Sequence, residues 1–463
     1  MVVYIGEFSK YIIALLIALY TLECFAVFCF DNEERRRGIY IGQNLLMFAF
    51  HFTCFLVICF ETGDMTYLFF YAFQQIMLYA AVVLYRMLYP KANRLIVNNM
   101  CMLLSVSFVI LTRLDMGKAV KQFVIVTGSL AVALIIPFFV HKFKFLKNLK
   151  WIYALVGIAA LSIVMILGQT TYGSKLSYSI AGITFQPSEF VKIIFVFFVA
   201  SALYQSYGFF EVFTTAVIAA AHVIVLVISK DLGSALIFFM VYVLMVFVAT
   251  KNVLYLLAGA AGGSAAAYIA YTVFSHVQVR VQAWRDPWSV IDSAGYQITQ
   301  SLFAISSGDW FGLGIYKGTP EAIPFVEADF IFSAIAEEFG IIFSVCLILI
   351  CVSCFIMFMH TAAALKDKFY QLTAFGLGVT YIFQVFLTIG GGTKFIPLTG
   401  VTLPLISYGG SSVLTTLVMF AIIEGLYMIR QDESEQQRRA LRKKKKIRER
   451  RQYSAGDEIE DEE

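Results

Sequence analysis

Charged residues are scarce in this sequence. Only 14% of its 463 residues are Asp, Glu, Lys or Arg, whereas 60% are hydrophobic, and the mean hydropathy is +0.79. A soluble protein of this length cannot hide so much apolar surface, because surface-to-volume scaling leaves too little interior. The scarcity of charge therefore excludes a water-soluble protein and predicts a membrane protein.

Three further absences limit the kinds of segment and site that this sequence can contain. The first apolar run, residues 11–30, is too long for a signal peptide and lacks a small-residue cleavage site, so we expect no cleaved leader. The CxxC of Cys351 and Cys354 has no second pair or nearby ligating His, and His222 has no second ligand at a suitable spacing. We interpret these residues as packing within helices. The GxxxxGK[ST] pattern is missing as well, so no P-loop nucleotide site is expected.

What is present is a series of apolar runs, which predicts an all-α, polytopic transmembrane helix bundle. Each run is near 20 residues, the length at which a helix crosses ~30 Å of hydrocarbon. We predict about thirteen spans, at residues 11–30, 40–60, 67–88, 99–113, 120–141, 151–168, 188–206, 210–228, 232–250, 253–275, 331–359, 369–390 and 408–429.

Lys and Arg cluster in particular connections, and this bias predicts the orientation. Thirteen spans place all the basic connections on one side, which is the cytoplasm by the positive-inside rule. These connections are 31–39, 86–98, 142–150, 366–368 and the tail. The N-terminus is then outside, together with loops 61–66, 169–187, 276–330 and 391–407.

The C-terminal tail, residues 431–463, is predicted to be cytoplasmic and disordered. Its basic run, from Arg438 to Arg451, is followed by an acidic end, Asp457–Glu463. Such a run could bind nucleic acid. Its position directly after a span is more typical of retention at anionic lipids, and no nucleic-acid partner is expected.

Loop 276–330 is much longer than the other connections, and long ordered loops often carry function. It ends at Asp329, directly before an apolar run. Asp329 either caps the following helix or acts as a general base whose basicity is raised by partial burial. Glu327 and Asp329 together suggest a weak site for a divalent cation, Mg²⁺ or Mn²⁺.

Other charged residues near the outer side are candidates for substrate binding. Helical rise would place Glu337 and Glu338 roughly 12 Å inward from Asp329, where they must face a partner or a wet cavity. Glu189 and Lys192 share a helix face, so they form either a local ion pair or part of a phosphate site. The other cations on the outer side are Arg280, Arg285 and Lys394. They either bind an anionic group of the substrate or simply anchor the protein at the membrane surface.

Several segments, taken in order, resemble the SEDS family (shape, elongation, division and sporulation), to which FtsW, RodA and SpoVE belong. The similar stretches are Gln186-Pro187-Ser188-Glu189 with Lys192, Asp231-Leu232-Gly233-Ser234-Ala235, Ala294-Gly295-Tyr296-Gln297 with Gln300-Ser301, Gly312-Leu313-Gly314, Asp329-Phe330-Ile331-Phe332 with Glu337-Glu338-Phe339-Gly340, and the run from Thr399 to Ser412. Together they cover about residues 100–430.

The resemblance implies a peptidoglycan glycosyltransferase in the bacterial cytoplasmic membrane. Such an enzyme polymerises lipid II outside the membrane and releases undecaprenyl pyrophosphate, with inversion at the anomeric carbon. Asp329 occupies the position of the essential acid, which deprotonates the acceptor sugar's 4-hydroxyl. The expected substrate-contacting residues are Lys192, Glu189, Arg280, Arg285, Glu337, Glu338, Lys394, Ser407 and Ser411. A class B penicillin-binding transpeptidase is the implied partner.

The sequence departs from the family pattern in two places. Glu327 stands where the family usually has a His in Pro-Glu-Ala-His-Thr-Asp, since this chain reads Pro324 to Ala328 as PFVEA. Residues 1–95 add three spans to a ten-span core, residues 96–430. A flippase for the lipid-linked precursor and a non-catalytic scaffold remain as alternatives. Neither the division, elongation or sporulation role nor the function of the added spans follows from the sequence.

Overall fold

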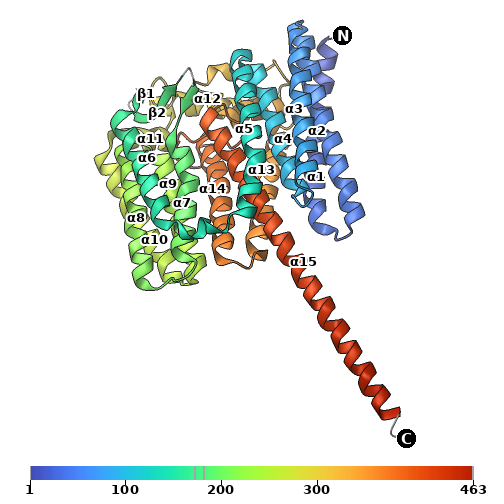
Figure 1. The fold of residues 1–463 in the computed structure, drawn as a ribbon. Helices are drawn as coiled ribbons and strands as arrows, with labels where there is room; N and C mark the ends of the chain where they lie inside the picture. Colours follow the sequence, from blue (N-terminus) through green and yellow to red (C-terminus); the bar gives the residue numbers. More distant parts are fainter. Residues whose placement is uncertain (1, 172–173, 181–182, 461–463) are drawn as a thin grey trace.

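The computed structural model describes residues 2–171, 174–180 and 183–460, and most of them lie in one bundle of helices (Figure 1). The first nine α-helices are α1 (Val2–Cys29), α2 (Glu33–Thr62), α3 (Thr66–Leu88), α4 (Arg94–Leu114), α5 (Met116–Lys142), α6 (Lys150–Leu167), α7 (Pro187–Leu203), α8 (Phe209–Ile228) and α9 (Leu232–Thr250). The remaining six are α10 (Val253–Val273), α11 (Ser275–Arg285), α12 (Tyr296–Ser307), α13 (Ile331–Ala364), α14 (Lys368–Gly392) and α15 (Gly410–Glu460). Short 3-10 helices are η1 (Lys144–Asn148), η2 (Trp288–Val290) and η3 (Pro320–Ala322).

Each of the thirteen predicted spans coincides with one helix of the bundle. Among the described residues, eleven helices are long and apolar enough to cross a membrane: α1 to α5, α8 to α10 and α13 to α15. The two others, α6 and α7, have 18 and 17 residues, near the lower limit for a span. The all-α, many-span prediction is confirmed, while the exact count of thirteen stays a prediction.

Helix α4 lies at the centre of the bundle, where every residue from Leu95 to Arg113 is buried. The predicted span began only at residue 99 because polar residues precede it. In the structure Asn98 and Asn99 are buried and satisfied by hydrogen bonds, to Gln43 Oε1 (2.9 Å) and Ser353 Oγ (2.7 Å). Buried polar groups with partners can extend a buried helix beyond its apolar run.

Contacts between connections show which of them share an end of the bundle. At one end, Lys91 and His141 both bind Asp432, each at 2.6 Å, and Lys147 lies 3.4 Å from Asp367. At the other end, loop 276–330 meets loops 61–66 and 391–407 (Figure 1). The basic connections joined by these contacts therefore share one end, as the charge bias predicted.

Loop 169–187 forms strands, which the all-α prediction did not include. The strands β1 (Gln169–Thr171), β2 (Ser174–Ile180) and β3 (Ile183–Phe185) pair antiparallel in the order β1-β2-β3. Tyr178 lies opposite Phe185, and Gln169 opposite Ser177. A connection of this length satisfies its backbone by pairing with itself at the outer end of the bundle.

The tail is a helix where the sequence predicted disorder. Helix α15 continues from the bundle to Glu460 and projects away from it (Figure 1). Its Lys, Arg, Glu and Gln residues favour helix over strand, and the membrane-spanning part supplies the costly first turn. Residues 461–463 lie outside the described residues.

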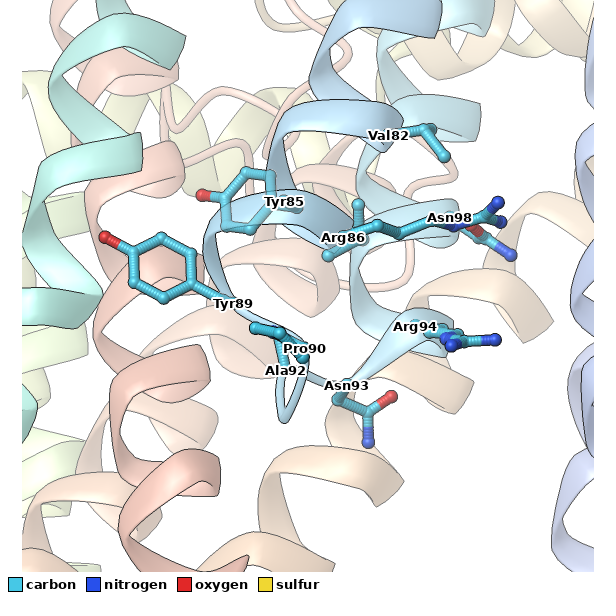
Figure 2. Close-up of a pocket in the computed structure, with 10 residues that line it drawn as sticks. Val82, Tyr85, Arg86, Tyr89, Pro90, Ala92, Asn93, Arg94 and Asn98 are labelled. Atoms are coloured by element: carbon cyan, nitrogen blue, oxygen red, sulfur yellow. The ribbon is translucent and has the colours of Figure 1, made fainter. Parts of the chain in front are cut away.

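The turn between α3 and α4 marks the junction between the predicted units 1–95 and 96–430. Figure 2 shows the small cavity there, lined by Tyr85, Arg86, Tyr89, Asn93 and Arg94 among others. Its volume of about 20 Å³ suits one water molecule. The backbone N–H of Asn93 donates to Glu424 of α15 at 2.7 Å. This cavity is too small for a lipid-linked sugar and lies at the opposite end from Asp329.

Candidate active site

Asp329 does not cap the helix that follows it. The N-cap residue of α13 is Phe330, and no side chain caps this end. The Asp329 backbone N–H donates to the Phe325 carbonyl at 3.2 Å, which closes a turn just before the helix. The capping interpretation of Asp329 is therefore wrong.

The Asp329 side chain lines a cavity of about 510 Å³. Three parts of the long loop and one neighbouring loop form its wall: helix α11, helix α12, the turn before α13, and the segment after α14. The lining residues are Val279, Arg280, Ala283, Trp284, Ala294, Gln297, Ile298, Phe325, Ala328, Asp329, Gly391, Ile396 and Leu398. The wall is thus mainly apolar, with one acid and one guanidinium.

Burial raises the pKa of Asp329 to about 6. The positive charge of Arg280 opposes this rise, and the negative charge of Glu327 adds to it. A carboxyl with a pKa near 6 is mostly ionised at pH 7 yet more basic than an exposed one, which suits a general base.

Arg280 is held in place by backbone carbonyls. Its Nη1 atom donates to the carbonyls of Leu398 (3.3 Å) and Thr399 (3.4 Å). Gly400, at φ +74°, lies between the two charged groups, since a Cβ there would be 3.8 Å from Arg280 Nη2 and 3.9 Å from Asp329 Oδ2. A residue other than Gly at position 400 would be strained because φ is positive.

Ser407 holds the backbone beside Asp329. Its hydroxyl donates to the Ala328 carbonyl at 2.5 Å and accepts from the Leu403 N–H at 2.9 Å. Next to it, the Tyr408 N–H donates to the Glu327 carbonyl at 2.8 Å. Ser407 therefore holds the backbone next to Asp329, and its contact with substrate stays a prediction.

A second cavity, of about 620 Å³, has Gly400 in its wall. Its wall includes Glu189, Asp231, Ser411 and Lys121. The predicted Glu189 and Ser411 thus line a cavity, although not the one that contains Asp329. Asp231 is held there by the N–H of Ser234 (3.1 Å) and the hydroxyl of Ser188 (3.0 Å).

Lys192 is buried beside this second cavity and is already paired. Its Nζ atom donates to Glu189 Oε1 and to Gln384 Oε1, both at 2.9 Å. The local ion pair weighed for Glu189 and Lys192 is present. Two of the three N–H donors of Lys192 are therefore used within the protein.

Glu337 and Glu338 are buried, and both accept hydrogen bonds from backbone N–H groups of the long outer loop. Glu338 pairs with Arg113 of α4 at 2.5 Å and accepts from the Tyr316 N–H at 3.1 Å. Glu337 accepts from the Thr319 N–H at 2.9 Å. Both carboxylates thus have the partners that their expected position required, and the ion pair of Glu338 is of the structural kind.

The break in α13 is at Gly340, with φ +83° and ψ +177°. Segment 309–314 of the long loop fills the break with hydrogen bonds. The N–H groups of Leu313 and Gly314 donate to the carbonyls of Glu337 and Glu338, at 2.9 and 3.0 Å. The N–H groups of Ile341 and Ile342 donate to the carbonyls of Asp309 and Trp310, at 2.9 and 3.2 Å. Residues 331–339 therefore form a separate helical segment fastened to the loop.

Arg285 and Lys394 lie beside the Asp329 cavity. Arg285 is exposed at the end of α11. Lys394 is half-buried, and its carbonyl accepts from the Trp284 indole N–H at 3.1 Å. Of the three predicted outer cations, only Arg280 lines the same cavity as Asp329.

The expected cation site at Glu327 and Asp329 does not fit a divalent ion. Glu327 Oε1 accepts a 2.5 Å bond from Lys118 of α5, and Arg280 faces Asp329. Each carboxylate thus already faces a protein cation. Among the described residues, no group of three His, Cys, Asp or Glu side chains is placed to hold a metal ion.

Sequence reasoning missed Arg113, Lys118 and Lys121. Arg113 binds Glu338, Glu321 and the Gly318 carbonyl, and so joins α4 to the loop. A signal was available, since the connection between the fourth and fifth spans carries cations on the predicted outer side, against the positive-inside rule. Cations in such a place need acidic partners.

Comparisons with known proteins identify the family. The FtsW, RodA and SpoVE family model, described as "Cell cycle protein", matches residues 85–432. The peptidoglycan glycosyltransferase RodA of Mycobacterium tuberculosis H37Rv is 34% identical over 315 residues, which is 64% of this chain and 67% of the relative. That of Mycobacterium leprae is 32% identical over 360 residues, 72% of this chain and 77% of the relative.

A solved structure supports the fold. It is described as showing the coordination of polymerisation and crosslinking by a peptidoglycan synthase complex, and one of its chains matches with a TM-score of 0.63 at 23% identity. The match covers 74% of this chain and 98% of that one. With its eleven candidate spans, the chain is a multi-pass bacterial membrane protein that belongs to the FtsW, RodA and SpoVE family of cell cycle proteins.

Proposed function

We propose that this protein is a peptidoglycan glycosyltransferase that polymerises lipid II, with Asp329 as the general base. The observation that carries the proposal is the Asp329 carboxyl, which lines a cavity with Arg280 and has a pKa raised to about 6 by burial. The relatives named peptidoglycan glycosyltransferase RodA support the same activity.

In the proposed step, Asp329 takes the proton of the acceptor sugar's 4-hydroxyl. The hydroxyl oxygen then bonds to the anomeric carbon of the donor, and the bond from that carbon to the pyrophosphate oxygen breaks. Undecaprenyl pyrophosphate leaves with the electron pair, and attack from the opposite face inverts the anomeric carbon. Base catalysis of this kind contributes about 10²- to 10⁴-fold.

The leaving pyrophosphate needs positive charge nearby, and protein cations supply it in this proposal. Arg280 is fixed at the cavity wall, and its planar fork suits phosphate oxygens. Arg285 and Lys394 lie at the margin and would meet the part of the pyrophosphate farther from Asp329. No step passes through a metal ion, because Lys118 already neutralises Glu327.

The second cavity is the proposed place for a further part of the lipid-linked substrates. Gly400 lines it and also lies close to Asp329. Glu189, Ser411 and Asp231 offer oxygen acceptors for sugar hydroxyls. Lys192 would hold Glu189 in place and would not contact phosphate itself.

The orientation and the partner also belong to the proposal. We place the end with the basic connections in the cytoplasm, which puts the C-terminus inside and the N-terminus and the Asp329 cavity outside. A class B penicillin-binding transpeptidase acting on the outer side would crosslink the strands as they form.

A reconstitution experiment separates this function from the two alternatives. Purified protein in lipid vesicles, supplied with lipid II, is expected to form glycan strands that a muramidase digests. Movement of fluorescent lipid II between leaflets without polymer would favour the flippase. If neither polymer nor movement of lipid II is observed, the scaffold alternative remains and the proposed function is contradicted.

A further inference from the structure

The helices that precede the family match reach the long outer loop. The match begins at residue 85, so α1, α2 and nearly all of α3 are an addition to the family core. In Figure 1 these helices lie at one edge of the bundle, with the N-terminus at the outer end. The contacts at this outer end indicate what the added helices do.

Three different helices converge on residues 311–317 of the loop. The ring of Tyr11, in α1, lies 4.9 Å from that of Phe311. Glu61, at the end of α2, pairs with Lys317 at 3.0 Å. The side chain of Tyr67, in α3, lies close to that of Tyr316.

The same loop segment is fastened to the core on its other side. Its neighbours Asp309 to Gly314 fill the break in α13 at Gly340, and Tyr316 and Thr319 donate to Glu338 and Glu337. The loop segment therefore lies between the added helices and residues 331–339, the helical segment that begins two residues after Asp329.

The added helices are themselves fixed to the core by buried polar contacts. The Tyr20 hydroxyl donates to Asn99 Oδ1 at 3.0 Å, and Asn99 donates to Ser353 Oγ at 2.7 Å. Fully paired polar groups in a low-dielectric interior allow few alternative arrangements. Helix α1 is thus anchored to α4, and through Asn99 to α13, by buried hydrogen bonds.

We propose that α1–α3 act as a clamp that holds segment 309–321 of the loop against α13 and thereby positions Asp329. Glu61, Lys317 and Tyr11 are positioning residues in this proposal, since they reach the reaction only through the loop. The part that concerns turnover rests on the proposed function. The part that concerns the loop does not.

Hydrogen exchange and turnover test the clamp in the full chain in lipid nanodiscs. The variants are Glu61→Gln, Tyr11→Ala, their combination, and the charge swap Glu61→Lys with Lys317→Glu. The matched control is Glu7→Gln, an exposed acid of α1 that pairs with Lys10 on the same helix. We expect Glu61→Gln to speed amide exchange over residues 309–321 roughly two- to five-fold, the range for one half-exposed ion pair.

In the same samples kcat for lipid II polymerisation should fall at least two-fold with KM unchanged. The charge swap should restore both exchange and kcat, and the control should alter neither. If the clamp only stabilised the fold, the variants would have a lower melting temperature, and the kcat of the folded enzyme would be unchanged.

Each of the other experimental outcomes contradicts one part of the proposal. Unchanged exchange in Glu61→Gln and in the combined variant overturns the clamp. Faster exchange with unchanged kcat overturns the positioning of Asp329. If the wild type forms no glycan, the proposed function fails, and the exchange data still decide whether the added helices hold the loop.

Discussion

At the scale of single residues, the chemistry depends on one half-buried acid, Asp329. Burial raises the pKa of Asp329 to about 6, so the residue is protonated and inactive as a base below that pH and ionised above it. We expect kcat/KM for lipid II to rise with pH and to reach half its plateau near pH 6. A profile flat from pH 5 to pH 8 would show that no group with this pKa controls the reaction.

Arg280 acts on the same group in the opposite direction. Its charge lowers the pKa of Asp329, so Arg280→Gln should move the rising part of the pH profile to higher pH. The variant should also lose about 10- to 100-fold in rate at pH 7.5, because a charge-assisted contact to the leaving group is missing. Arg35→Gln, which removes an exposed cation at the start of α2 far from the cavity, is the control and should change neither the pH profile nor the rate.

The residues that form the site could be predicted only in part. Asp329 was identified through the family resemblance, and Arg280 through its place on the outer side. Arg113 and Lys118 were missed, because their partners Glu338 and Glu327 are more than 200 residues away in the chain. Ion pairs between distant segments leave no spacing signal.

At the scale of elements, the break in α13 is the feature on which the loop depends. Gly340 has a positive φ, and a Cβ there would meet the backbone of Trp310 and Phe311. Gly340→Ala should therefore expel segment 309–314 and reduce glycan synthesis more than ten-fold in correctly inserted protein. Gly38→Ala in α2, where nothing lies within 4 Å, is the matched control and should behave as wild type.

The helices themselves were predictable, since each apolar run of span length became a helix. The break in α13 was not predictable, because one Gly inside an apolar run is commonly tolerated by a helix. Its backbone groups are paired with the loop, and pairing of this kind is invisible in the sequence. The three strands were missed for a similar reason, since β1, β2 and β3 pair with one another and such pairing is not visible in the sequence.

At the scale of the whole molecule, the orientation follows from charge. We expect a Cys introduced at Asp292, in the long loop, to react with a membrane-impermeant maleimide in intact cells. A Cys at Lys366, which lies at the end with the basic connections, should react only after permeabilisation. Labelling in the reverse order would place the Asp329 cavity in the cytoplasm and contradict the proposed reaction.

The whole account depends on the Asp329 carboxylate, and one comparison tests it most directly. Glycan formed from lipid II is measured with purified wild type, Asp329→Asn and Asp292→Asn, the last removing an exposed acid from the same loop. The account predicts normal synthesis by Asp292→Asn and a loss of at least 100-fold in Asp329→Asn, within the range for a lost general base. Equal glycan yield from Asp329→Asn and wild type would contradict it.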